Sequence, residues 1–69
     1  MNLRDLRKQA GLSVKEVASK LNVAPSTFYQ YEKGERGLPI LTAYNLALLY
    51  GITLDEVVEA IINSSQHDL

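Results

Sequence analysis

The stretch Ser13–Gly34, SVKEVASKLNVAPSTFYQYEKG, decides the fold that this sequence predicts. Ser13 and Glu16 have the spacing of a capping box, in which each side chain accepts a backbone N–H at the start of a helix. An apolar stripe at helical spacing follows and stops at Asn22, a residue type that tolerates the left-handed conformation of helix ends. Pro25 suits the first position of a second helix, because proline there loses no hydrogen bond. The stretch therefore predicts two short helices joined by a tight turn.

Two helices of this length cannot bury their apolar sides alone, so the rest of the chain has to supply a core. Three further segments carry helical spacing or helix caps, over residues 3–10, about 40–50 and 54–62. Asn2 can cap the first segment, and Thr53 forms a second capping box with Glu56 before the last. The spacing within the helices predicts these inward residues: Leu3, Leu6, Ala10, Phe28 and Tyr31.

No segment alternates with a period of two for long enough to predict a strand. We therefore expect an all-α fold, a compact bundle of five short helices, in one domain over residues 1–63 with a flexible tail at 64–69. A chain of 69 residues has room for one modest core. It contains no cysteine, and no apolar run approaches the roughly 20 residues of a membrane span. These features predict a soluble cytoplasmic protein.

The net charge of −1 conceals an uneven distribution along the chain. Residues 1–36 hold all seven lysines and arginines and four acidic residues, a net charge of +3. Residues 37–69 hold four acidic residues and no lysine or arginine, a net charge of −4 with histidine neutral. This asymmetry favours one face for a polyanion and another kept away from it. The alternative is a chance segregation of solvated charges.

Several ordered motifs together resemble the Cro and phage-repressor (Xre) type of helix-turn-helix domain. They are L-R-x-L-R, G-L-S-V-K-E-V-A-S-K-L-N-V, S-T-F-Y-Q-Y-E-K-G and L-A-x-x-Y-G-I, which lie within Leu3–Val58. The resemblance implies a lambda repressor-like domain of five helices, whose third helix enters the DNA major groove. It also implies these further core residues: Leu46, Ala47, Tyr50, Ile52, Leu54, Val57 and Val58.

The resemblance places four side chains of the third helix toward the DNA bases: Ser26, Thr27, Tyr29 and Gln30. Glutamine can pair bidentately with adenine, and hydroxyl groups can bond base edges or phosphates. The alternative is that Ser26 and Thr27 only support the first turn of a surface helix, while Tyr29 and Gln30 are solvated. Pro25 departs from the family pattern, because it has no donor at a position that often reads a base.

Phosphate contacts are implied at both ends of the two-helix unit. Free N–H groups of Ser13, Val14 and Lys15 would favour an anion at the start of the second helix, and Lys33 and Arg36 would reach phosphates from the far side. Val14 stands where the family often carries glutamine, which removes one side-chain contact.

Arg7 and Glu32 match family positions that form an ion pair between the first helix and the end of the third. We expect the main role of Arg7 to be this structural ion pair, and a phosphate contact to be its secondary role. Arg4 and Lys8 are expected on a solvated face.

The acidic half of the chain carries more apolar residues than one core needs. Leu41, Tyr44, Leu48 or Leu49, Ile61 and Ile62 have no obvious interior place, although some can cover the first helix. A small domain rarely exposes such a surface without a partner, so we expect a homodimer. The dimer surface would comprise Leu48, Glu59, Ile61 and Ile62. A dimer would in turn imply a near-palindromic operator.

Two functions follow from these patterns. The first is a sequence-specific double-stranded DNA-binding transcriptional regulator, a repressor of phage, plasmid or bacterial type. The second is a protein-interaction module on the same fold, an anti-repressor or antitoxin that engages a regulatory protein partner through the helix over 54–62. An enzyme is not expected, because His67 is the only histidine and lies in the polar tail. No metal site or cofactor is expected either.

Overall fold

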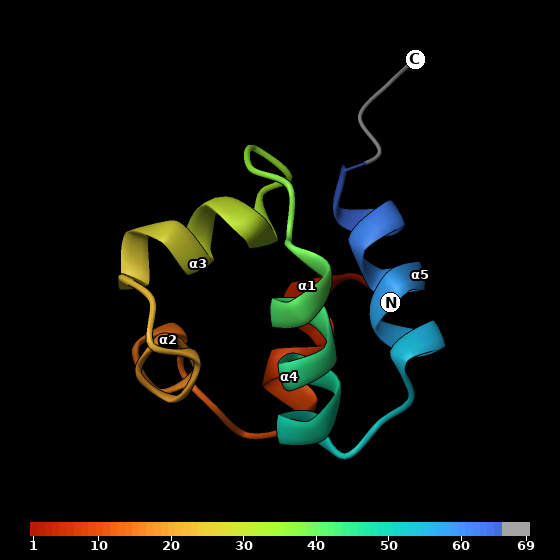
Figure 1. Cartoon of the computed structure of the whole chain (residues 1–69), viewed down its shortest axis with the longest axis horizontal. Coiled ribbons are helices and arrows are strands. Elements are labelled where there is room, and N and C mark those ends of the chain that lie inside the picture. Colours follow the sequence, from red (N-terminus) through yellow and green to blue (C-terminus); the bar gives the residue numbers. More distant parts are fainter. Residues whose placement is uncertain (66–69) are drawn as a thin grey trace.

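The computed structural model describes residues 1–65 of the chain, which contain five helices and no strand. The helices are α1 (Leu3–Gln9), α2 (Val14–Leu21), α3 (Pro25–Glu32), α4 (Ile40–Tyr50) and α5 (Leu54–Ser65). α2 and α3 form the helix-turn-helix on one side of the molecule, α5 lies on the other, and α1 and α4 overlap in the middle of the view (Figure 1). The expected all-α fold of five helices is confirmed.

Capping boxes start α2 and α5 as the sequence predicts. The Ser13 hydroxyl accepts the backbone N–H of Glu16 at 3.1 Å, and the Glu16 carboxylate accepts that of Ser13 at 2.8 Å. Thr53 and Glu56 make the same reciprocal bonds before α5, at 3.1 and 3.3 Å. Each box satisfies donors that a helix start otherwise leaves without partners.

The first four helices all end in a Schellman turn. The residues with positive φ are Gly11 (73°), Asn22 (60°), Gly34 (74°) and Gly51 (70°). In each turn the residue after the one with positive φ donates its backbone N–H to the carbonyl oxygen five residues earlier. These bonds run from Leu12 to Arg7, Val23 to Ala18, Glu35 to Gln30 and Ile52 to Ala47. Leu12, Val23 and Ile52 pack against the core, as such turns favour, whereas Glu35 is exposed. The turn after α3 is therefore the one that faces outward.

One core joins all five helices. Phe28 of α3 is fully buried at its centre and packs edge-to-face against Tyr31, with ring centroids 6.2 Å apart. The buried residues are Leu3, Leu6, Val17, Ala18, Phe28, Tyr31, Ala43, Leu46, Ala47, Val57 and Ala60.

Two expected core residues lie outside. Ala10 is exposed because α1 ends at Gln9 and Ala10 is its C-cap. Val58 is 39% exposed because Val57 and Ala60 supply the inward spacing of α5. Tyr50, Ile52 and Leu54 pack against the core but are only partly buried.

The last helix extends past residue 63, the expected end of the domain. α5 continues to Ser65, and the Ser64 hydroxyl accepts the Leu3 N–H at 2.9 Å while it donates to the Ala60 carbonyl at 2.8 Å. Asn63 donates to the Met1 carbonyl at 2.7 Å, so the start of α1 lies beside the end of α5 (Figure 1). These contacts join Ser64 to the start of α1. Residues 66–69 of the expected tail, with His67, lie outside the described residues.

Among the described residues, no helix combines the length and the apolar character that crossing a bilayer requires.

Candidate nucleic-acid interface

α3 turns a mixed polar surface away from the core. Because Phe28 and Tyr31 are buried, the other side of the helix faces outward. Pro25 and Ser26 are exposed there, Tyr29 is 53% exposed, and Thr27 and Gln30 are half-buried. The four side chains predicted to face the bases thus retain access to the surface of the molecule.

The start of α2 offers fewer free donors than the sequence predicts. The N–H of Ser13 is already donated to the Glu16 carboxylate, so it is not free for a phosphate. This bond, together with the Ser13 side chain, lowers the pKa of Glu16 and keeps a negative charge at the helix start. The N–H groups of Val14 and Lys15 still lie in the first turn, where a helix has no internal acceptors for them. Val14 itself packs its side chain against the core.

The turn after α3 gathers several of the predicted contact residues. The Lys33 ammonium lies 5.1 Å from the centre of the Tyr29 ring and 3.4 Å from a carboxylate oxygen of Glu35. On the same turn, Nε of Arg36 donates to the Oε1 atom of Gln30 at 2.9 Å. Glu35 belongs to this group although the sequence patterns did not predict it; its position between Lys33 and Arg36 in K-G-E-R was the available signal.

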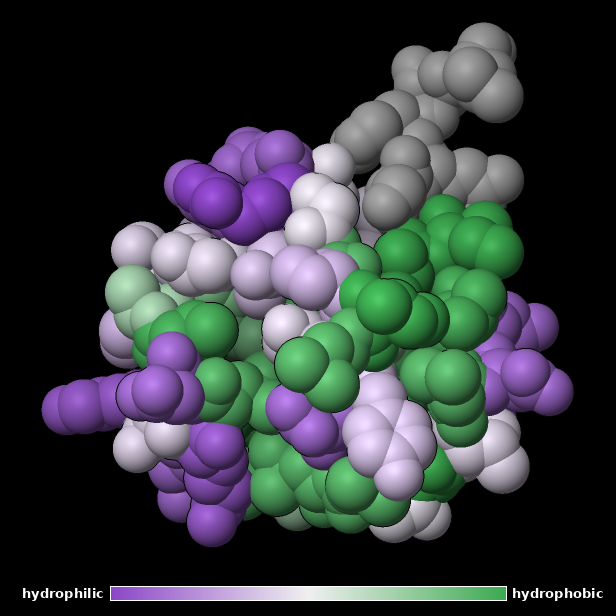
Figure 2. All heavy atoms as spheres, viewed as in Figure 1, coloured by the Kyte–Doolittle hydropathy of each residue, from purple (hydrophilic) through white to green (hydrophobic). Residues whose placement is uncertain are grey.

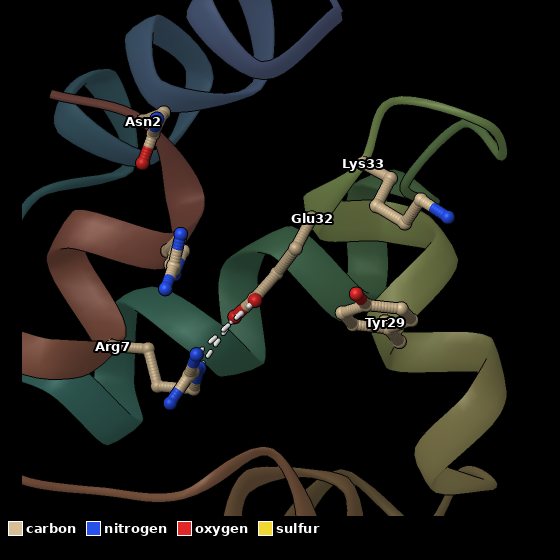
Figure 3. A pocket seen from close by; sticks show the side chains of 6 residues that line it. Asn2, Arg7, Tyr29, Glu32 and Lys33 are labelled. Atoms are coloured by element: carbon tan, nitrogen blue, oxygen red, sulfur yellow. Dashed lines mark hydrogen bonds and ion pairs between the residues drawn. The ribbon is translucent and has the colours of Figure 1, made fainter.

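The ion pair between Arg7 and Glu32 is present and joins α1 to α3 (Figure 3). Nε and Nη2 of Arg7 donate to the two carboxylate oxygens of Glu32 at 2.6 and 3.3 Å, and Nη1 donates to the Leu12 carbonyl at 3.0 Å. The side chains are only 12% and 3% exposed. The bond to Glu32 raises the pKa of Arg7, so the guanidinium stays charged in this partly buried place.

A hollow of about 410 Å³ lies beside this pair, between α1 and the end of α3 (Figure 3). Its lining carries three basic groups against one carboxylate: Asn2, Arg4, Arg7, Tyr29, Glu32 and Lys33. Because Arg7 and Glu32 neutralise each other, the lining keeps the charges of Arg4 and Lys33, and the charge of Lys33 is partly offset by Glu35 outside the lining. A basic hollow that shares Tyr29 and Lys33 with the outer face of α3 suits an anionic neighbour of that helix.

Exposed apolar side chains gather on the opposite helices. Figure 2 shows hydrophobic residues over α4 and α5, and hydrophilic residues over α2 and the turn after α3. We define the α4–α5 apolar surface by its exposed members: Ile40, Leu41, Tyr44, Leu48, Val58 and Ile62. Leu48 and Ile62, which were predicted for a partner surface, are 65% and 57% exposed, and Glu59 is exposed as well. Ile61, the fourth residue of that prediction, is instead partly buried against the core.

Groups of three or more side chains suited to hold a metal ion do not occur among the described residues.

Comparison with known proteins agrees with this geometry. A helix-turn-helix family model matches residues 3–57. The chain is 38% identical over 56 residues to the cryptic phage CTXphi transcriptional repressor RstR of Vibrio cholerae, covering 81% of this chain and 50% of that protein. It is 30% identical over 59 residues to the HTH-type transcriptional regulator DdrOP3 of Deinococcus deserti, covering 86% and 46%.

A putative HTH-type transcriptional regulatory protein of Pyrobaculum aerophilum is 43% identical over 49 residues, which cover 71% of this chain and 20% of that protein. The chain therefore spans half or less of each of these relatives. No solved structure gives a significant match. The match over residues 3–57 shows that the chain belongs to the helix-turn-helix family of the Cro and phage-repressor type.

Proposed function

We propose that the chain is a sequence-specific double-stranded DNA-binding transcriptional regulator, and specifically a repressor. The observation that carries this proposal is the outward face of α3 on a helix-turn-helix frame, where Tyr29 lies against Lys33 and Gln30 is bonded to Arg36. Ser26 and Thr27 lie in the first turn of the same helix. Relatives described as a phage repressor and as transcriptional regulators support it. The proposal includes no catalytic step and no cofactor, and it places the protein in the cytoplasm with its DNA.

The proposed contacts divide into two kinds. Ser26, Thr27, Tyr29 and Gln30 read base edges in the major groove, where hydroxyl and amide groups distinguish base pairs. The N–H groups of Val14 and Lys15, and the side chains of Lys33 and Arg36, hold phosphates and set the position of α3. Glu16 and Glu35 place negative charge beside these phosphate contacts, which predicts a modest affinity for one copy of the domain.

A homodimer on DNA is the second part of the proposal. The α4–α5 apolar surface leaves large side chains such as Leu41 and Leu48 more than 60% exposed. Residues 37–69 hold no lysine or arginine, so a contact between two copies through this part leaves the basic side free for DNA. Two copies related by a twofold axis would read half-sites about 34–36 Å apart in a near-palindromic operator.

Selection of duplexes from a random DNA library tests the function. We expect the protein to enrich a sequence whose two halves are inverted repeats. Gln30→Ala should lose preference at one base pair of each half-site, whereas Lys33→Ala should weaken binding to all sequences and reduce the slope of log affinity against log salt by about one. Lys8→Ala removes an equal charge from the exposed surface of α1 and serves as the control. Absence of any enriched sequence at low salt would contradict the proposal and favour a protein-interaction module.

A further inference from the structure

We propose that Arg36 is a positioning residue that determines which base Gln30 reads, and that the base is guanine. The inference rests on the proposed DNA-binding function and deepens it. The contact that carries it is the bond of 2.9 Å from Nε of Arg36 to the side chain of Gln30. It joins the turn after α3 to a side chain on the outer face of the helix.

The chemistry of the two groups identifies the atoms in this bond. A guanidinium has only donors, so the Gln30 atom that faces Nε must be the amide oxygen. The orientation of the Gln30 amide, which is otherwise ambiguous by a flip of oxygen and nitrogen, is thereby set by its partner. The NH₂ group is left to point elsewhere.

The backbone holds Arg36 close to this oxygen. The Glu35 N–H bonds the carbonyl of Gln30 at 2.9 Å, and the Gly34 N–H bonds that of Tyr31 at 3.2 Å. Gly34 adopts φ 74°, which lets the chain reverse over the last turn of α3. Arg36 comes two residues after Gly34, and its side chain bonds Gln30, the residue whose carbonyl already accepts the Glu35 N–H. A backbone bond and a side-chain bond to Gln30 thus support the same arrangement.

The held amide presents donors to the groove. Adenine requires an acceptor for its N6 amino group and a donor for N7, so a glutamine must offer its oxygen and nitrogen side by side. The Gln30 oxygen has a second lone pair, but because it is turned toward Arg36 and away from the groove, the group that Gln30 extends toward the bases is its NH₂, with two N–H bonds. Guanine presents two adjacent acceptors, O6 and N7, in the major groove and is the base that suits this pattern.

Arg36 can also keep the phosphate contact proposed for it. Its Nη groups are not used in the bond to Gln30, and a guanidinium is planar and can serve two partners along different edges. Lysine keeps the positive charge but lacks this fixed fork. The two roles of Arg36 are therefore separable by substitution.

The test compares base preference and salt dependence across four variants on the selected operator and its single-base changes. Gln30→Ala identifies the base pair that Gln30 reads, and wild-type protein should prefer guanine there. Arg36→Lys should reduce the preference for guanine over adenine at that pair by at least about fivefold, which is the lower end of the discrimination that one bidentate contact provides. The salt slope should stay unchanged, because lysine keeps the charge. In the Gln30→Ala background, Arg36→Lys should leave base preference unchanged.

Lys33→Gln is the matched control, since it removes a charge from the same turn. It should reduce the salt slope by about one and leave the preference at the Gln30 base pair as in the wild type. Far-UV circular dichroism and thermal melting confirm that each variant folds.

The outcomes separate the two proposals. A wild type that enriches no sequence contradicts the proposed function. A wild type that enriches a sequence but prefers adenine at the Gln30 pair, or an Arg36→Lys protein with unchanged preference, overturns only the role given to Arg36. That role is also overturned if Gln30→Ala changes the preference at no single base pair.

Discussion

At the scale of single residues, the ion pair of Arg7 and Glu32 is the contact whose loss should cost most. Glu32→Gln leaves the guanidinium of Arg7, only 12% exposed, without its carboxylate. We expect the free energy of unfolding in urea to fall by about 3 kcal/mol, because an uncompensated charge remains inside the protein. The double mutant Glu32→Gln/Arg7→Met, in which the unpaired charge is removed as well, should be more stable than Glu32→Gln alone, and a double-mutant cycle measures the difference.

Lys33 and Glu35 provide an internal control for that prediction. Their side chains are 48% and 55% exposed, so solvent screens their attraction. Glu35→Gln should change the unfolding free energy by less than about 0.5 kcal/mol. Equal effects of the two glutamate substitutions would show that the pair of Arg7 and Glu32 has no special structural role.

Tyr50 yields a second prediction at the residue scale. Its hydroxyl is buried without a hydrogen-bond partner among the described residues, and burial raises its pKa. Removing an unsatisfied buried group removes its desolvation cost, so Tyr50→Phe should raise the unfolding free energy by roughly 1 kcal/mol. Tyr44→Phe, at a tyrosine that is 51% exposed, should leave it unchanged. A clear loss of stability in Tyr50→Phe would mean that the hydroxyl has a partner in solution.

At the scale of elements, the capping box of α2 links stability to pH. Hydrogen bonds with Ser13 lower the pKa of Glu16 in the folded state. The stabilisation is therefore present above the ordinary glutamate pKa, about 4.3, and is lost as the pH falls through the lower folded value. Glu16→Gln should destabilise the protein at neutral pH, and its difference from the wild type in urea unfolding should disappear on acidification.

Ser13→Ala tests the other half of the same box. We expect the unfolding free energy to fall by about 1 kcal/mol, the usual effect of removing an N-cap side chain. Ser19→Ala, at an exposed serine later in α2, controls for the loss of a hydroxyl. If both alanine variants melted alike, the hydrogen bonds of the cap would contribute nothing to stability.

At the scale of the whole molecule, the separation of charge from apolar surface predicts assembly. In sedimentation experiments the wild type should shift from monomer toward dimer as its concentration rises. Leu48→Glu places a charge on the α4–α5 apolar surface and should prevent this shift. It should also lose cooperative binding to a two-half-site operator while keeping its affinity for one half-site.

Ala10→Glu adds the same charge at an exposed position outside that surface and is the control. It should dimerise as the wild type does. A wild type that remained monomeric both in solution and on the full operator would contradict the dimer.

The sequence by itself determined the elements of this protein, because the signals for them are local. A capping box spans four residues, and a Schellman turn needs one residue that accepts positive φ, such as Gly34 or Asn22. These signals act on the neighbouring backbone whatever the rest of the chain does. They indicated the five helices, whereas the outward face of α3 followed from the spacing of Phe28 and Tyr31 and from the family resemblance. The end of α5 at Ser65 had no such local signal.

Only the tertiary structure decided how the site is arranged. The bond from Leu3 to Ser64 joins residues 61 positions apart, and the pair of Arg7 and Glu32 joins residues 25 apart. The latter was expected through family resemblance alone. Even the bond between Arg36 and Gln30 depends on how the turn after α3 folds back. Such contacts follow from the angles at which helices and turns pack, and packing depends on all the side chains of the core together.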